Sequence, residues 1–153
     1  SLSLCEIMMD DNHFMNEALK EAQKAYDADE VPVGAVIVAN NKIIARGHNL
    51  TERLTDVTAH AEMQAITSAA NALGGKYLQE CTLYVTLETC PMCAGALNWA
   101  QITKVVYGAS DAKRGFTTIS NNMLHPKTIV ISGINEAECG EIISRFFLEK
   151  RGK

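Results

Sequence analysis

Two short pieces of sequence decide the fold expected for this chain: Thr58-Ala59-His60-Ala61-Glu62 and Cys90-Pro91-Met92-Cys93. Each is expected at the start of a helix that lies beside a strand. The two cysteines are three residues apart, so they face the same side of one helical turn. The free N–H groups and the dipole at a helix start favour thiolates there. Two helix starts that meet beside one sheet would bring the imidazole and both thiols together.

Imidazole and thiolate are the ligands that zinc prefers, and catalytic zinc sites use three protein ligands plus water. We therefore predict that His60, Cys90 and Cys93 bind one Zn²⁺. Glu62 lies two residues after His60, an offset of about 200° in mid-helix. In the first turn, with the small Ala61 between them, both side chains can reach one cavity. Glu62 is then a free carboxylate that can move protons for a water activated by zinc, as in a hydrolytic enzyme.

The cysteine pair could also belong to a redox site or to a structural zinc site. A lone C-x-x-C is common in redox and buried settings, but a redox site would leave the H-x-E stretch without a role. A structural zinc site needs a fourth ligand. Four residues could supply it, but none of them forms a second spaced pair: Cys81, Cys139, His48 and His125.

The rest of the chain alternates helical and strand periodicity. Helices are expected over 12–27, 59–73, 91–100 and 135–150, and strands over 34–38, 43–47, 82–87, 104–107 and 128–131. Thr58 and Thr89 are candidate caps for the second and third helices. This order predicts a three-layer α/β/α domain with a central mixed sheet of about five strands. Residues 1–153 form one domain, with 1–10 expected as a loose N-terminal extension.

The net charge is −4, but residues 1–30 carry −6 and residues 104–153 carry +3. Nucleic-acid binders usually show a basic footprint, so any nucleic-acid contact should be local. The odd number of cysteines, five, shows no disulfide framework and predicts a reducing, cytoplasmic setting. No signal peptide is visible. The longest apolar run, 31–39, is shorter than the roughly 20 residues of a membrane span, so no membrane partner is expected.

These stretches resemble the zinc-dependent cytidine/deoxycytidylate deaminase superfamily, whose signature joins H-x-E to C-x-x-C. The resemblance is closer to bacterial tRNA-specific adenosine deaminases and covers nearly the whole chain. It is carried by Glu30-Val31-Pro32-Val33-Gly34-Ala35-Val36, Thr58-Ala59-His60-Ala61-Glu62, Leu83-Tyr84-Val85-Thr86-Leu87-Glu88, Met92-Cys93-Ala94-Gly95-Ala96 and Gly108-Ala109-Ser110-Asp111-Ala112-Lys113.

The resemblance implies a role for each matching residue. His60, Cys90 and Cys93 would bind zinc, and Glu62 would carry protons. Substrate contacts would come from Asn49, which would hold the nucleoside, the backbone N–H of Ala61, Asp111 and Lys113 along the nucleotide path, and the aromatic pair Phe146 and Phe147 beside the anticodon loop. At least one residue of the aromatic pair could equally be ordinary core.

The implied reaction converts the flipped-out wobble adenosine of a tRNA anticodon loop to inosine and releases ammonia. The implied assembly is a homodimer with a shared groove. One position departs from the pattern: Thr89 stands where proline is expected before the first cysteine, and Pro91 follows that cysteine. Two alternatives stay open, a deaminase of a free base or nucleoside such as guanine or cytosine, and a non-catalytic zinc-stabilised binding module.

Overall fold

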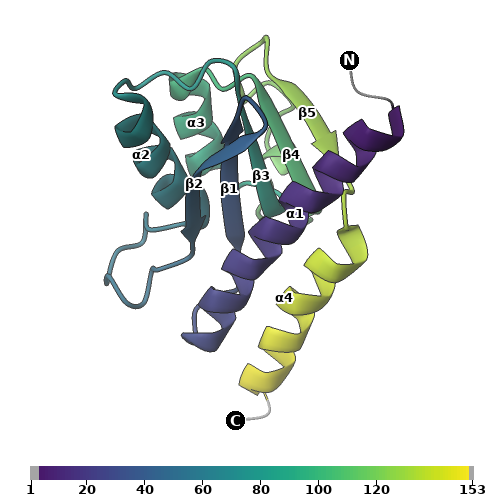
Figure 1. Ribbon diagram of the computed structural model, residues 1–153. Helices are drawn as coiled ribbons and strands as arrows, with labels where there is room; N and C mark the ends of the chain where they lie inside the picture. Colours follow the sequence, from purple (N-terminus) through teal and green to yellow (C-terminus); the bar gives the residue numbers. More distant parts are fainter. Residues whose placement is uncertain (1–3, 152–153) are drawn as a thin grey trace.

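A five-stranded mixed sheet forms the middle layer of the protein (Figure 1). The computed structural model describes residues 4–151, with side chains from residue 11 onward. In spatial order the strands are β2 (Lys42–His48), β1 (Gly34–Ala39), β3 (Cys81–Leu87), β4 (Lys104–Ala109) and β5 (Ile129–Ser132). β1 pairs antiparallel with β2 and β3, whereas β3–β4 and β4–β5 are parallel. The predicted mixed sheet of five strands is confirmed.

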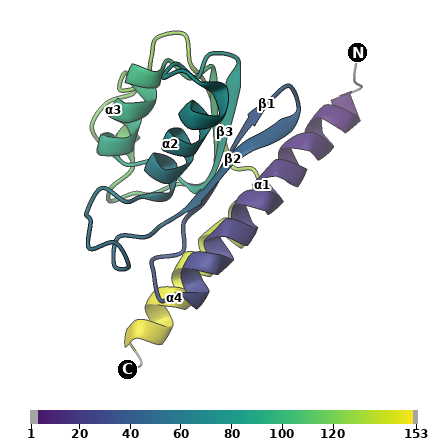
Figure 2. The same cartoon turned by 60° about the vertical axis from the view of Figure 1, so that its left-hand side comes forward.

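Helices cover both faces of the sheet, as Figures 1 and 2 show. α1 (Leu4–Asp27) and α4 (Glu136–Arg151) lie side by side on one face, and α2 (Ala61–Leu73) and α3 (Pro91–Ala100) cover the other. A single 3-10 turn, η1 (Phe116–Thr118), interrupts the long connection between β4 and β5. The three-layer α/β/α architecture predicted from the order of elements is confirmed.

The core is divided into two apolar clusters by the sheet itself. Neighbouring residues of a strand point to opposite faces. Ile37 and Leu83 therefore pack in the cluster that includes residues of α2 and α3, while Val36 and Tyr84 pack in the cluster that includes residues of α1. Because both faces are covered, β1 is buried along almost its whole length, as its continuous apolar sequence predicted.

Two local features hold the first hairpin in place. Asn40 and Asn41 both have positive φ, 52° and 60°, which is the backbone of the two-residue turn that matches the twist of paired strands. At Gly34, a Cβ atom would overlap the backbone of α1 at Ala18 and Ala22. Only glycine lets the start of β1 approach α1 this closely.

The starts or the caps of three helices differ from the predictions. α1 begins at Leu4 rather than residue 12, so residues 4–10 of the expected loose extension belong to this helix, and residues 1–3 lie outside the described residues. α2 is capped by His60 rather than Thr58, because the Thr58 hydroxyl donates to Asp56 Oδ1 (2.8 Å). α3 begins at Pro91 as predicted, but its N-cap is Cys90 rather than Thr89, because the Thr89 hydroxyl donates to a side chain of α2 instead.

Candidate active site

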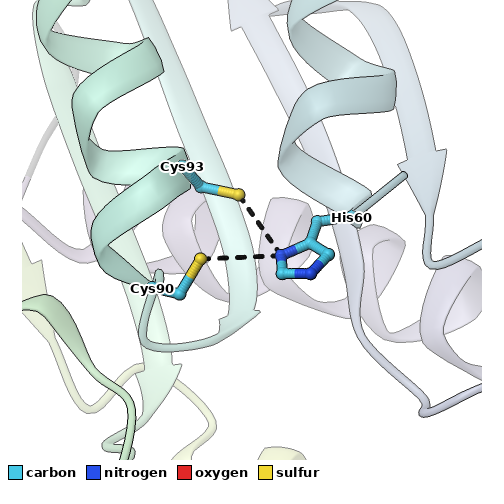
Figure 3. Close-up of side chains that lie close together, drawn as sticks. All are labelled: His60, Cys90 and Cys93. Carbon is cyan, nitrogen blue, oxygen red and sulfur yellow. Dashed lines mark hydrogen bonds between the residues drawn. The ribbon is translucent and has the colours of Figure 1, made fainter. Parts of the chain in front are cut away.

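The starts of α2 and α3 place the three predicted metal ligands together. His60 and Cys90 are the N-cap residues of these helices, both with extended backbone, and Cys93 lies in the first turn of α3. Because both helices cover the same face of the sheet, the three side chains converge (Figure 3). His60 Nδ1 lies 3.6 Å from Cys90 Sγ and 3.5 Å from Cys93 Sγ.

This geometry fits a tetrahedral zinc ion. Ligands at about 2.0–2.1 Å for nitrogen and 2.3 Å for sulfur would lie about 3.6 Å apart at a tetrahedral angle. The two measured N···S separations match this value, and all three ligand atoms lie within 4.8 Å of one another. Among the described residues, no other group of His, Cys, Asp and Glu meets this spacing. The three ligands leave one tetrahedral position for water or substrate.

Hydrogen bonds among the three predicted ligands favour the thiolate form of Cys90. The thiol of Cys93 donates to Cys90 and, helped by His60, lowers the pKa of Cys90 to about 4. The same donation and its burial raise the pKa of Cys93. The hydrogen bond with Cys90 also raises the pKa of His60. Cys90 is therefore ready to bind a cation, and metal binding at Cys93 would release a proton.

Glu62 lies beside this group but is not part of it. It occupies the first turn of α2 and is only 4% exposed. Burial raises the pKa of its carboxyl, and a hydrogen bond from Thr89 Oγ1 to Glu62 Oε2 (2.5 Å) opposes that rise. A carboxyl group with a raised pKa can both accept and return a proton near neutral pH. The predicted free carboxylate therefore lies where a proton carrier is needed.

A pocket of about 1010 Å³ opens over the ligand group. Its lining comes from the segments on either side of the first hairpin, the start of α2, the end of β3, the loop after β4 and α4. The predicted site residues that line it are His60, Cys90, Glu62, Asn49, Ala61, Asp111, Lys113 and Phe147. Cys93 is fully buried and is not among the residues that line the pocket.

Phe146 and Phe147 have different environments. Phe147 is 43% exposed and lines the pocket. Phe146 is buried, with its ring 5.7 Å from that of Tyr26 in an edge-to-face contact. Adjacent residues of a helix point about 100° apart, so only one of the pair faces the pocket. Phe146 packs between α4 and α1 instead.

Asn49 is held by backbone bonds at the end of β2. Its Nδ2 donates to the carbonyl of Val31 (3.2 Å), and its Oδ1 accepts from the N–H of Thr51 (3.2 Å). A side-chain amide has two donors and two lone pairs. One donor and one lone pair of this fixed amide therefore stay available toward the pocket.

Two buried carboxylates that the sequence patterns did not identify shape the walls. Glu88 is 5% exposed and accepts bonds from the N–H of Asp111 (3.1 Å), the N–H of Thr117 (3.1 Å) and the Thr117 hydroxyl (2.7 Å). At Gly115 a Cβ would overlap the Glu88 carboxylate, so glycine lets the loop close around it. Glu88 thus fixes the loop that carries Asp111 and Lys113.

Glu30 holds the loop that follows Asn49 in a similar way. It is 1% exposed and accepts from the N–H groups of Glu52 (2.9 Å) and Arg53 (2.8 Å). Glu30 and Glu88 each border an apolar strand segment in the sequence. A charged residue against such a run is the signal that could have identified both, because a buried carboxylate needs several donors.

Basic side chains gather at the pocket although the whole chain is acidic. The four that line it are Lys113, Arg114, Lys150 and Arg151. One is partly neutralised, because Lys150 Nζ lies 2.8 Å from Asp29 Oδ2. The local basic footprint predicted for the C-terminal third therefore lies at the same pocket as the predicted metal ligands.

Comparisons with known proteins identify the family of this chain. The MafB19-like deaminase family matches residues 9–151. The tRNA-specific adenosine deaminase of Bacillus subtilis (strain 168) is 49% identical over 151 residues, covering 95% of this chain and 94% of that protein. A structure solved in a study of A-to-I editing by tRNA:A34 deaminases at the wobble position has a TM-score of 0.79 and 46% identity, covering 85% of this chain and 98% of that one.

The guanine deaminase of Bacillus subtilis is a more distant solved structure, with a TM-score of 0.63 and 37% identity. It covers 74% of this chain, and the match spans 76% of that chain. The similarity to the tRNA-specific enzymes is higher in both identity and coverage. This chain belongs to the tRNA-specific adenosine deaminase family of MafB19-like deaminases.

Proposed function

We propose that this protein is a zinc-dependent hydrolytic deaminase that converts the wobble adenosine of a tRNA anticodon loop to inosine. The observation that carries the proposal is the buried Glu62 beside the His60–Cys90–Cys93 group at the wall of one pocket. In the reaction, water supplies the oxygen that replaces the amine at C6 of adenine, and ammonia leaves.

The residues divide this chemistry between them. His60, Cys90 and Cys93 would hold the zinc ion, which supplies a Lewis acid that activates water near neutral pH. Glu62 would accept one proton from the attacking water and deliver it to the ring nitrogen. It would then take the second proton of that oxygen and pass it to the departing amine, which leaves as ammonia. Asn49 and the N–H of Ala61 would orient the nucleoside, and both line the pocket.

The shape and charge of the pocket favour a nucleic acid over a free base. A pocket of about 1010 Å³ lies at the upper end of small-molecule sites, which are roughly 300–1,000 Å³. The basic residues that line it can neutralise phosphates, while Phe147 can stack on a base. A base can enter only when removed from its stack, which suits a single-stranded loop.

The second candidate is deamination of a free base or nucleoside, such as guanine or cytosine. It is favoured by the 37% identity with the Bacillus subtilis guanine deaminase. A non-catalytic zinc-stabilised binding module is the remaining alternative, and it predicts zinc without turnover of any substrate.

A panel assay separates the three. Ammonia release is measured with an arginine tRNA anticodon stem-loop, guanine, cytosine, cytidine and adenine, each with the wild-type chain and Glu62→Gln. We expect release from the stem-loop alone, with inosine appearing at the wobble position. Release from small molecules only would overturn the tRNA substrate, and no release from any of them would favour the binding module.

We further propose that the protein acts as a homodimer in the cytoplasm, where its tRNA substrate is found. α3 presents Met92 and Trp99, seven residues apart on one helix face and 39% and 84% exposed. Large exposed apolar side chains on one face are typical of a subunit contact. In the part of the chain that the structure describes, none of the helices has the length and apolar character of a membrane span.

A further inference from the structure

Thr89 makes a buried contact with the proton carrier. The residue lies in the link between β3 and α3, directly before Cys90, and has no exposed surface. Its hydroxyl donates to Glu62 Oε2 at 2.5 Å. This separation is at the short end of the range for O–H···O hydrogen bonds, which is about 2.5–3.0 Å. The hydrogen bond joins residues of two separate helix starts.

The donor is held rigidly. The backbone carbonyl of Thr89 accepts from the N–H of Phe116 (2.9 Å), which ties the link to η1. Threonine is branched at Cβ and stiff about χ1. The oxygen therefore has little freedom to move away from the carboxylate.

The acceptor, by contrast, needs an external constraint. The last torsion of a glutamate side chain is broad, without sharp rotamer wells. Among the described residues, Thr89 is the one side chain that donates a hydrogen bond to Glu62. Thr89 engages Oε2, and the backbone N–H of Glu62 itself also bonds to the carboxylate, so these two donors set its orientation. A proline at position 89 would lack the hydroxyl and could not provide this contact.

We propose that Thr89 is a positioning residue, whose hydroxyl orients the Glu62 carboxylate for proton transfer. The proposal rests on the proposed function, in which Glu62 carries the protons. It assigns a role to the position at which this chain carries threonine rather than the expected proline. Thr89 itself does not touch the reacting base, since it is absent from the residues that line the pocket.

Three variants of the full-length protein test this role with the stem-loop substrate. Thr89→Val keeps the shape and removes the hydroxyl, and Thr89→Ser keeps the hydroxyl. Thr86→Val is the matched control, because the fully buried Thr86 hydroxyl bonds to the backbone N–H of Gly34 and not to the site. Steady-state kinetics, bound zinc and thermal unfolding are measured for each.

We expect Thr89→Val to lower kcat roughly 10- to 100-fold, as removal of outer-sphere partners does, with zinc content unchanged. KM should stay within about 2-fold, because the lost contact acts on the chemical step. Thr89→Ser should recover most of kcat, and Thr86→Val should keep it. Unchanged kcat in Thr89→Val, a loss of kcat that follows a loss of zinc, or no rescue by serine would overturn the proposal.

Crystal structures of the wild type and Thr89→Val give a readout that does not need turnover. The carboxylate of Glu62 should rotate or adopt several conformers in the variant, and a carboxylate that keeps the wild-type orientation would overturn the proposal. If the wild type deaminates no substrate, the proposed function fails, while this comparison still decides the role of Thr89.

Discussion

At the scale of single residues, Glu62 and the three predicted zinc ligands have separate proposed roles. Glu62 is buried beside the ligand group, but its contact is with Thr89 and not with a position in that group. We expect Glu62→Gln to keep bound zinc and to lower deamination by roughly 10²- to 10⁴-fold, since the amide cannot carry a proton. Metal analysis and ammonia release measure the two properties. Loss of zinc together with activity would contradict the assignment of Glu62.

For Cys93, a predicted ligand, we expect the opposite effect on bound zinc. It is fully buried and close to His60 Nδ1, and metal binding is coupled to folding at such sites. Cys93→Ser should lose the zinc ion and unfold at a lower temperature, as measured by metal analysis and a thermal melt. Cys139→Ser is the matched control, because that buried thiol lies outside the ligand group. Wild-type zinc content in Cys93→Ser would refute the ligand set.

At the scale of secondary-structure elements, an ion pair between α1 and β2 makes the stability of the fold depend on pH. Arg46 and Lys20 hydrogen-bond Glu17 and lower the pKa of its carboxyl from 4.5 to about 2. Because the pKa of Glu17 is lower in the folded than in the unfolded state, this contact stabilises the fold above about pH 4.5. The stabilisation is lost as the pH falls toward 2. Urea unfolding should show that Glu17→Gln costs about 1 kcal/mol at pH 7, given the exposure of Arg46, and less at pH 3.5. An equal cost at both pH values would contradict this.

The loop between β4 and β5 is held by Glu88, a carboxylate in the connection between β3 and α3. The Glu88 carboxylate accepts hydrogen bonds from the N–H of Asp111 and from the N–H and hydroxyl of Thr117. Glu88→Gln would place an amide N–H₂ against at least one of these donors, which should lower the free energy of unfolding by about 1–3 kcal/mol. Hydrogen exchange over 110–118 should become faster, and KM for the stem-loop should rise while zinc is retained. Glu30→Gln is the matched control and should loosen residues 50–57 instead. Unchanged exchange over 110–118 would contradict the role of Glu88.

The assembly of the whole molecule can be tested on α3. Trp99 is 84% exposed, which is unusual for an aromatic side chain of this size. Trp99→Glu should convert a dimer to a monomer in sedimentation, with zinc retained, because a charge would then be buried at the contact. If the groove is shared, KM for the stem-loop should also rise. A wild-type chain that sediments as a monomer would contradict the proposed dimer.

The order of elements, and the group of side chains that could hold a metal ion, could be predicted from local properties. The periodicity of apolar residues identifies each strand and helix, and the ligand chemistry of His60, Cys90 and Cys93 is written in their residue types. Short-range preferences of this kind survive folding because they act within a few residues. The start of α1 was the exception, since the expected extension contributes helix from Leu4.

The tertiary structure decided which long-range partner each polar side chain has. Thr89 was a plausible helix cap, yet its hydroxyl reaches Glu62 across 27 residues, because α2 and α3 start side by side on one face of the sheet. Phe146 and Phe147 are equivalent in sequence, but the packing of α4 on α1 sends only one of them to the pocket. The sequence alone therefore predicted a zinc site and hydrolytic chemistry at His60-Ala61-Glu62 and Cys90-Pro91-Met92-Cys93. The positions of the groups around them followed from distances between elements, which no local pattern encodes.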